Sequence, residues 1–304
     1  MKFKCYRDWY QLPQSCNALF SHSERESIFI SREWFEKLTQ HVLTDEQELL
    51  LVCVVENTDG TNDAQAKDHK QEEKVLAILP LLTNENKEWT SLCHRYIAVY
   101  SVICEENYQL EIYNCLSQGL KALPFDYLTL SPIADDDVRL QSLQLALEAT
   151  DIACYRNFHS YNWFHKTNGQ NFSDYLSKRP AQLRNTIVRK YRKLEREHHC
   201  EIRLHSGIDD DIAKALTNYH AIYKHSWKAN EQYEKIVQGF TYNASELGWT
   251  RLAILYVEDQ PIAAHLWFVV DKKASIFRLV YDQNWKQYSP GTILMNYLME
   301  HVID

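Results

Sequence analysis

Residues 251–304 read RLAILYVEDQPIAAHLWFVVDKKASIFRLVYDQNWKQYSPGTILMNYLMEHVID, and this stretch decides the fold of the C-terminal half. Polar interruptions at 258–261 and 271–273 separate three apolar runs, which predicts an antiparallel meander. Pro290 and Gly291 then prepare a helix, in which the apolar positions recur at helical spacing. These positions are Ile293, Leu294, Tyr297, Leu298 and Val302. A sheet that leads through a short loop into a helix N-terminus offers backbone N–H groups to an anion.

The totals indicate a globular chain of two domains. Its 304 residues are enough for one large or two ordinary domains, and hydrophobic residues make up 45% of the chain. Aromatic residues add to this potential core at 12% of the chain, which excludes global disorder. The net charge of -8 argues against a surface that coats nucleic acid, so no DNA partner is expected.

Cysteine usage and the N-terminus favour a cytoplasmic protein. The eight cysteines are scattered without a CxxC pair, which is typical of reduced thiols used as small core residues. Neither disulfides nor a metal site are expected. The N-terminal segment MKFKCYRDWYQLPQSC lacks an apolar leader, and no apolar run approaches the ~18 residues of a membrane span.

The first half mixes helices and strands. Ser31 is placed to cap a helix that ends near Val42. The polar insert at 57–73 is interpreted as a mobile hairpin loop between two apolar strands. The remaining expected elements are strands at 48–56, 74–82, 96–103 and 151–164, helices at 108–123 and 137–149, and an extended segment at 125–130. This order predicts an α+β domain with a mostly antiparallel sheet and one parallel junction.

A basic helix is predicted at 180–198. Leu183, Ile187, Tyr191 and Leu194 form its apolar stripe. The opposite face carries Arg184, Arg189, Lys190, Arg192, Lys193 and Arg196. This face is either a solvated surface that joins two domains or a docking surface for an anionic donor or acceptor. Under the second interpretation, Arg189 and Lys190 are candidate substrate-binding residues.

After this helix, the predicted order is the opening order of a GNAT acyltransferase domain. A strand at 201–205 precedes a helix at 212–227, whose N-terminus follows three aspartates, and a second helix at 233–247. The meander and the last helix complete the order.

Four segments in this order resemble signature segments of bacterial FemAB-like GNAT proteins. They are RPAQLRNTIVRKYRKLE, SWKANE, ELGWTRLAILYVEDQPIAAHLWF and YDQNWKQYSPGTILMNYLMEHVID. Proteins of this family carry a BioF2-like or cellulose-biosynthesis-like acetyltransferase domain and often occur with exopolysaccharide genes. The resemblance covers 171–304 and extends to the first half only in layout. It implies an α+β fold of two tandem GNAT-like domains, with mixed, mostly antiparallel sheets flanked by helices. Residues 1–170 would be the degenerate domain and 171–304 the acyltransferase domain.

The chain departs from the family pattern in two places. His265 stands where the family has Gln, and the chain stops at Asp304, where the family continues into another strand. We therefore expect the second domain to be incomplete at its C-terminus.

The resemblance also implies that acyl-CoA is the acyl donor, and acetyl-CoA is its expected form. It further indicates where this donor would bind. In a GNAT site the donor pyrophosphate binds at the start of the third helix. The matching positions here are Ser289, Gly291, Thr292 and Ile293. Glycine permits close approach, and the positive end of a helix favours negative charge.

The chemistry of acyl transfer suggests the remaining roles. Tyr281 is a candidate proton donor to the leaving thiolate, and Asp282 or Glu231 is a candidate to orient or deprotonate the amine. Trp227 and Lys228 end the helix where such folds receive the acceptor. His265 is either a base that faces the cleft or a core histidine. Trp227, Lys228 and His265 join Arg189 and Lys190 as candidate substrate-binding positions.

Three functions remain open at this point. The first is an N-acyltransferase that uses acyl-CoA and acts on an amino sugar or another small amine of cell-surface polysaccharide synthesis. The second is a Fem-type transferase that uses aminoacyl-tRNA and meets RNA through the basic helix. The third is a non-catalytic GNAT-like binding module.

Overall fold

The computed structural model describes residues 1–56, 73–94, 96–105, 110–207, 211–228 and 233–304. Contacts divide the chain into two compact units, Met1–Asn162 and Trp163–Asp304. The domain boundary expected after residue 170 lies inside the second unit and stays a prediction. The hairpin loop expected at 57–73 lies outside the described residues, except for Glu73.

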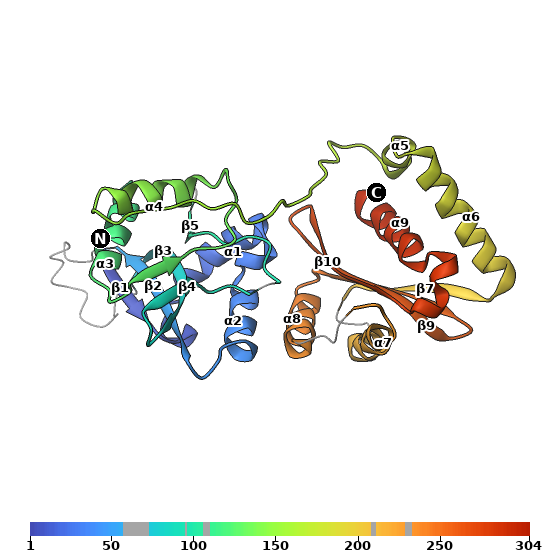
Figure 1. Ribbon diagram of the computed structural model, residues 1–304, viewed down its shortest axis with the longest axis horizontal. Coiled ribbons are helices and arrows are strands. Elements are labelled where there is room, and N and C mark those ends of the chain that lie inside the picture. Colours follow the sequence, from blue (N-terminus) through green and yellow to red (C-terminus); the bar gives the residue numbers. More distant parts are fainter. Residues whose placement is uncertain (57–72, 95, 106–109, 208–210, 229–232) are drawn as a thin grey trace, which may run out of the picture. The chain divides into compact units, whose positions relative to one another are not determined.

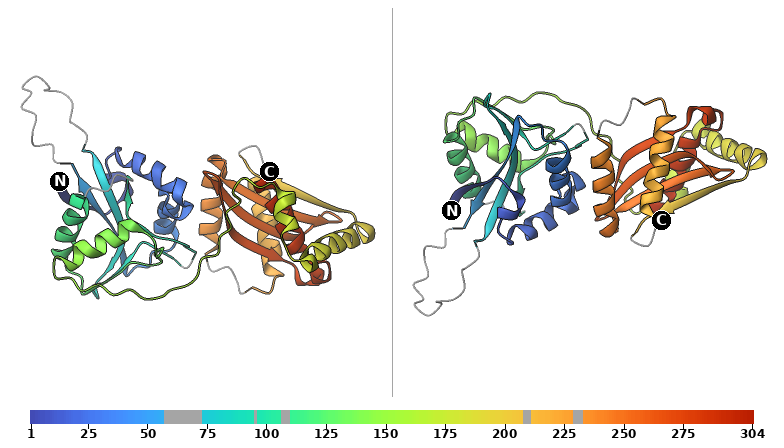
Figure 2. Two further views of the ribbon diagram at one scale, coloured as in Figure 1. Left: turned by 90° about the horizontal axis from the view of Figure 1, so that it is seen from above. Right: turned by 90° about the horizontal axis from the view of Figure 1, so that it is seen from below.

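The first unit is a mixed sheet covered by helices on both faces (Figure 2). Its strands are β1 (Lys2–Tyr6), β2 (Gln47–Val55), β3 (Val75–Asn84), β4 (Glu88–Ser91), β5 (Ile103–Cys104) and β6 (Tyr127–Thr129). Its helices are η1 (Trp9–Gln11), α1 (Cys16–Glu26), η2 (Ile28–Ile30), α2 (Arg32–His41), α3 (Leu110–Lys121) and α4 (Val138–Glu148). The sheet order is β1-β2-β3-β4-β6, with β5 paired to β3. Only the β4–β6 pair is parallel among the described strands, which confirms the expected parallel junction.

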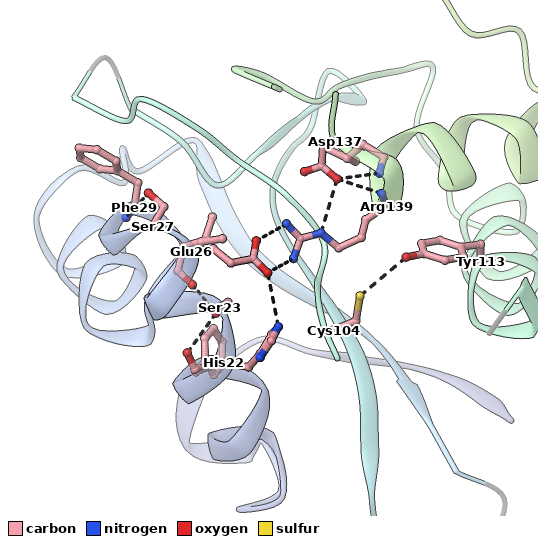
Figure 3. A network of polar contacts seen from close by, with 12 residues as sticks. His22, Ser23, Glu26, Ser27, Phe29, Cys104, Tyr113, Asp137 and Arg139 are labelled. Atoms are coloured by element: carbon pink, nitrogen blue, oxygen red, sulfur yellow. Dashed lines mark hydrogen bonds and ion pairs between the residues drawn. The ribbon is translucent and has the colours of Figure 1, made fainter. Parts of the chain in front are cut away.

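A partly buried ion cluster ties α1 to α4 in this unit (Figure 3). Arg139 is 8% exposed, and its guanidinium donates two hydrogen bonds to Glu26, at 3.0 and 2.5 Å. Its Nε lies 3.4 Å from Asp137 Oδ1, and the same oxygen caps α4. Burial alone would lower the pKa of Arg139, but the bonds to Glu26 and the charges of Asp137 and Glu26 raise it. The cluster therefore holds a charged arginine inside the unit.

Two strands expected in the first half are wrong. Residues 96–102 form an irregular segment, because Tyr100 anchors it through its backbone N–H to Pro132 O and through its hydroxyl to Pro80 O. Residues 151–164 contain no strand, since this aromatic-rich segment has no neighbouring strand in the part of the chain described. A strand needs hydrogen bonds to a neighbouring strand to satisfy its backbone N–H and C=O groups. The strands β1 and β4 and the helix α1 were not predicted from the sequence.

The second unit is an antiparallel sheet with helices on both faces (Figure 1). Its strands are β7 (Cys200–His205), β8 (Thr250–Val257), β9 (Gln260–Val270) and β10 (Lys273–Tyr281), in the order β10-β9-β8-β7. Its helices are α5 (Phe172–Ser177), α6 (Ala181–Glu197), α7 (Ile212–Lys224), α8 (Glu234–Glu246), η3 (Gln283–Tyr288) and α9 (Pro290–Ile303). Helices α7 and α8 cover one face, and α6 and α9 cover the other. The predicted meander and final helix are confirmed.

Tight turns set the register of the meander. Glu258-Asp259 and Asp271-Lys272 each connect two strands, and all four residues have positive φ, between 43° and 63°. Two consecutive residues of this kind match the twist of the flanking strands in a hairpin. The turns thus fix which side chains of β8, β9 and β10 face α9.

The core beneath α9 joins α6, the sheet and the loop before α9. Its buried members are Leu194, Ala253, Leu255, Val257, Ile262, Ala263, Trp267, Tyr288, Ile293, Leu294 and Leu298. The apolar stripe predicted for α6 contributes Leu194 directly and Tyr191 at its edge. In both units, the predicted class of α+β with mostly antiparallel sheets flanked by helices is confirmed. None of the helices in the described ranges is long and apolar enough to cross a membrane.

Candidate active site

Strands β9 and β10 bring His265 and Tyr281 to the face of the sheet that α9 covers. His265 pairs with Leu279 of β10, and Ala263 pairs with Tyr281. Since successive side chains alternate between faces, His265, Leu279 and Tyr281 share a face with Ala263. A bulge between Ile276 and Arg278 shifts the pairing of β10 with β9 by one residue, and the shifted register places Leu279 opposite His265 and Tyr281 opposite Ala263.

The loop after β10 is built by short-range capping. Asp282 donates its N–H to Ile262 O at 2.8 Å, and its carboxylate Oδ1 accepts from Asn284 N at 2.9 Å, which caps η3. Ser289 then adopts a left-handed conformation, with φ of 54°, which turns the chain into α9. One carboxylate oxygen of the candidate base Asp282 is therefore already engaged in shaping the loop.

The start of α9 is less open than an ideal helix end. The N–H groups of Thr292 and Ile293 both donate to Ser289 O, at 3.0 and 3.2 Å. Pro290 has no N–H. The N–H of Gly291 has no protein acceptor within the described ranges. Four positions are proposed to bind acyl-CoA, and among them Gly291 thus has the backbone N–H that is best placed to donate a hydrogen bond to it.

Gly291 lies against His265 and Tyr281. A β-carbon at Gly291 would lie 3.5 Å from Tyr281 Cδ1 and 3.6 Å from His265 Nε2. The start of α9, the middle of β9 and the end of β10 therefore converge on one small region. The polar atoms available there are a backbone N–H, an imidazole and a phenol.

Trp227 and Lys228 reach the same region from the segment after α7. The rings of Trp227 and Tyr281 are 4.5 Å apart between centroids, and Trp227 is 51% exposed. Lys228 Nζ lies 5.7 Å from the Trp227 ring centroid. His225 O accepts from Gln283 N at 3.3 Å, which fastens this segment to the loop before α9. An exposed aromatic ring thus packs against Tyr281, and an ammonium group lies beside that ring.

His265 is a buried, neutral imidazole. It is 2% exposed, and its Nδ1 has no hydrogen-bond partner within the described chain. Burial and the charge of Lys228 lower its pKa to about 3. Both causes penalise the imidazolium, so the ring stays uncharged at neutral pH.

The basic helix α6 supports the loop before α9. Lys190 Nζ donates to Gln287 O, and the hydroxyl of Tyr288 donates to Glu197 Oε2 at 2.9 Å. His198 Nε2 lies 3.2 Å from the same hydroxyl. Lys190 therefore contacts the loop, whereas Arg189 is exposed on α6 and contacts none of the site residues by a hydrogen bond or ion pair in the part of the chain described.

The structure brings together five of the predicted site residues: Tyr281, Gly291, Trp227, Lys228 and His265. Glu231 lies outside the described residues. Tyr288 and Glu197, which hold the loop, were not predicted, because their pairing across 91 positions leaves no spacing pattern in the sequence.

Comparison with known proteins finds a family match within the second unit. Residues 181–304 match the family described as acetyltransferase (GNAT) domain. The crystal structure of FemX matches with 9% identity and a TM-score of 0.59, over 98% of this chain and 85% of the FemX chain. At this identity the likeness shows a shared fold only. No curated protein matches the chain in sequence.

Two more distant structures also match. One is the C-terminal domain of a protein designated lysylphosphatidylglycerol synthetase from Agrobacterium fabrum, with 10% identity, a TM-score of 0.43 and coverage of 75% of this chain. This chain spans 64% of that domain's length. The other is L-PGS from Bacillus licheniformis, with 12% identity and a TM-score of 0.41, over 90% of this chain and 72% of that one. With TM-scores below 0.5, neither likeness supports a conclusion about this protein.

Residues 181–304 of the second unit thus match a GNAT-type acetyltransferase domain, which the expected element order had indicated. The narrower resemblance to FemAB-like proteins with a BioF2-like domain stays a prediction.

Proposed function

We propose that the protein is an N-acyltransferase that moves an acyl group, with acetyl as the expected case, from acyl-CoA to an amine. The observation that carries this proposal is the convergence of the Gly291 N–H, Tyr281 and His265 at the start of α9. A GNAT-type domain uses acyl-CoA as its general co-substrate, and the helix start supplies both an N–H donor and a positive dipole end for an anionic donor.

The proposed chemistry assigns one task to each side chain. Tyr281 protonates the leaving thiolate, and the carboxylate oxygen of Asp282 that does not cap η3 takes the proton of the attacking amine. Glu231 is the alternative for that second task. Trp227 and Lys228 receive the acceptor, because an exposed ring beside an ammonium group offers a stacking surface and a charge.

We propose an amino sugar as the acceptor, in the synthesis of cell-surface polysaccharide. The Trp227 ring supports a cyclic acceptor, since a flat apolar surface packs well against the face of a ring. The polysaccharide context follows from the resemblance of the sequence segments to FemAB-like proteins.

A thermal-shift experiment tests the donor. Acetyl-CoA, longer acyl-CoAs and tRNA are added separately to one preparation of the full chain. A ligand at 100 times its Kd adds about 2.7 kcal/mol to the free energy of unfolding, so saturable stabilisation by an acyl-CoA is expected. No response to any acyl-CoA would refute the proposal. In transfer assays, Tyr281→Phe and Asp282→Asn are expected to slow acyl transfer, and unchanged rates would remove the two assigned roles.

One observation favours an aminoacyl-tRNA donor as the second candidate. Arg184, Arg189 and Arg192 are exposed on α6, and no ion pair neutralises them within the described residues. Such a surface suits a phosphate backbone. Saturable stabilisation by tRNA without any response to acyl-CoA would establish this candidate and displace the first.

A further inference from the structure

A cleft in the first unit lies outside the residues assigned to acyl transfer. Its lining comes from the segment 7–10, from α2 with the residues that follow it, and from the first residues of β2. The volume of the cleft is about 470 Å³. Small-molecule sites have volumes of about 300–1,000 Å³, so the cleft has the size of such a site.

The most buried part of the lining is apolar and firmly packed. Trp9 and Leu49 are 6% and 7% exposed. The indole Nε1 of Trp9 donates to Thr39 Oγ1 at 3.0 Å, and its ring stacks on Phe35 with centroids 6.2 Å apart. Because the polar atom of Trp9 is already bonded within the protein, a ligand in the cleft meets an apolar surface there.

Tyr10 adds an exposed aromatic ring to the same lining. Its side chain is 93% exposed, while its backbone is held by a hydrogen bond from Tyr10 N to Asp8 Oδ1 at 2.9 Å. The ring is thus presented to solvent from a fixed position. A tyrosine ring of this kind offers an apolar face, against which the C–H groups of a sugar ring can pack, and a hydroxyl group at its tip.

The charged side chains of the cleft leave one carboxylate without a cation. Glu48 pairs with Arg7, and Glu36 pairs with Arg32 at 2.7 Å. Asp8 forms no ion pair within the described residues. Its Oδ1 accepts from Tyr10 N, and its Oδ2 has no hydrogen-bond partner in that part of the chain. An uncompensated negative charge therefore lies beside the exposed ring of Tyr10, where it favours a cationic ligand.

Two further polar groups of the cleft can bind hydroxyl groups. The amide oxygen of Gln40 accepts from Lys37 Nζ at 3.1 Å, which leaves the amide N–H groups as donors. Glu36 uses Oε1 to accept from Arg32 and keeps Oε2 as an acceptor. Since a hydroxyl group both donates and accepts, it can bond with either side chain.

We propose that this cleft binds an amino sugar whose amine is free. The sugar ring packs against Tyr10 and the apolar lining, its ammonium group pairs with Asp8, and its hydroxyl groups bond with Gln40 and Glu36. Acetylation of the amine removes the positive charge, so the cleft prefers the unacetylated sugar. This inference goes beyond the proposed function, because the cleft belongs to the first unit and needs no acyl donor to bind its ligand.

A titration with two methyl glycosides tests the preference. Methyl β-glucosaminide and its N-acetyl derivative are added separately to the full chain at pH 6, where an aliphatic amine is protonated, and each Kd is measured by saturation-transfer NMR. The contact with Asp8 is exposed to water, so the free amine is expected to bind about two- to fivefold more tightly. Equal affinities for the two glycosides, or no saturable binding of either, would overturn the proposal.

Two variants assign the binding to its residues. Asp8→Asn keeps the cap of η1, because asparagine caps as well as aspartate, but it loses the charge and is expected to bind both glycosides equally. Tyr10→Ala is expected to weaken both glycosides by about two- to tenfold and to keep the preference for the free amine. A preference that survives in Asp8→Asn, or unchanged affinities in Tyr10→Ala, would contradict the arrangement.

Asp126→Asn is the matched control for net charge. Asp126 is exposed in the same unit and lies outside the lining of the cleft, so its substitution changes the charge by the same amount and should keep the preference. If it abolishes the preference as Asp8→Asn does, the amine is attracted by the whole protein and the proposal fails. Circular dichroism and melting temperature check folding. Because the titration contains no acyl-CoA, its failure leaves the proposed function standing, and failure of the acyl-CoA test leaves this site standing.

Discussion

Gly291→Ala should stabilise the protein and weaken donor binding at the same time. The new methyl group would lie 3.5 Å from Tyr281 Cδ1 and 3.6 Å from His265 Nε2, which are ordinary contact distances. No protein atom has to move. Gly291 has no positive φ and lies in the first turn of α9, so alanine adds about 0.4–1 kcal/mol of stability by restricting the unfolded chain.

The same methyl group fills the space between the helix start, His265 and Tyr281. A pyrophosphate oxygen bonded to the Gly291 N–H would lose that bond, and hydrogen bonds to charged groups contribute about 1.5–3 kcal/mol. Since every 1.4 kcal/mol is tenfold in affinity, we expect the Kd for acetyl-CoA to rise by about 10- to 100-fold.

Calorimetric titration with acetyl-CoA measures the Kd, and thermal unfolding without ligand measures stability. Gly207→Ala is the matched control, because a β-carbon there meets nothing within 4 Å. It should leave the Kd unchanged. If Gly291→Ala binds acetyl-CoA as tightly as the wild type, the placement of the donor at the start of α9 is wrong.

Three further predictions concern stability. The pKa of His265 is about 3 in the folded state against 6.5 in the unfolded chain, so the unfolded chain binds the proton first as the pH falls, and stability drops below about pH 6.5. His265 should account for about 2 kcal/mol of the stability lost between pH 7 and pH 5, and urea unfolding of His265→Leu at the two values should show a loss smaller by that amount. Glu26→Gln removes a charge partner of the buried Arg139 and should lower the free energy of unfolding by about 1–3 kcal/mol. This is less than for a fully buried pair, because Glu26 retains 31% side-chain exposure. Additive losses in a double-mutant cycle with Arg139→Met would contradict coupling between the two side chains. Replacing Asp271-Lys272 by Asn-Gly should raise the melting temperature, because both positions have positive φ, and a lower value would show that the turn residues have other contacts.

The fold of the second unit could be predicted from sequence because its signals are local. The polar pairs Glu258-Asp259 and Asp271-Lys272 fall between apolar runs, and Pro290 marks a helix start. The first half is different, because its ambiguous segments depend on distant partners. Tyr100 is held by hydrogen bonds to Pro132 O and Pro80 O. The aromatic residues at 155–164 have the sequence pattern of a strand, but no strand pairs with them in the described chain.

The candidate site shows the same division. The convergence of Tyr281, Gly291 and Trp227 could be predicted from a family resemblance that fixes the order of strands and helices. The hydrogen-bond partners and the burial of each group could not be predicted. That Ser289 O already accepts two N–H groups of α9, or that His265 Nδ1 has no partner, depends on backbone angles and burial that a residue letter does not encode.

The contacts of α6 with the loop before α9 have a consequence for dynamics. Lys190 donates to Gln287 O, and Tyr288 donates to Glu197, so the loop and the C-terminal half of α6 are held by the same bonds. A ligand that orders the loop must then also slow the local opening of α6. Amide hydrogen exchange in the last turns of α6 should therefore report on occupancy of the start of α9.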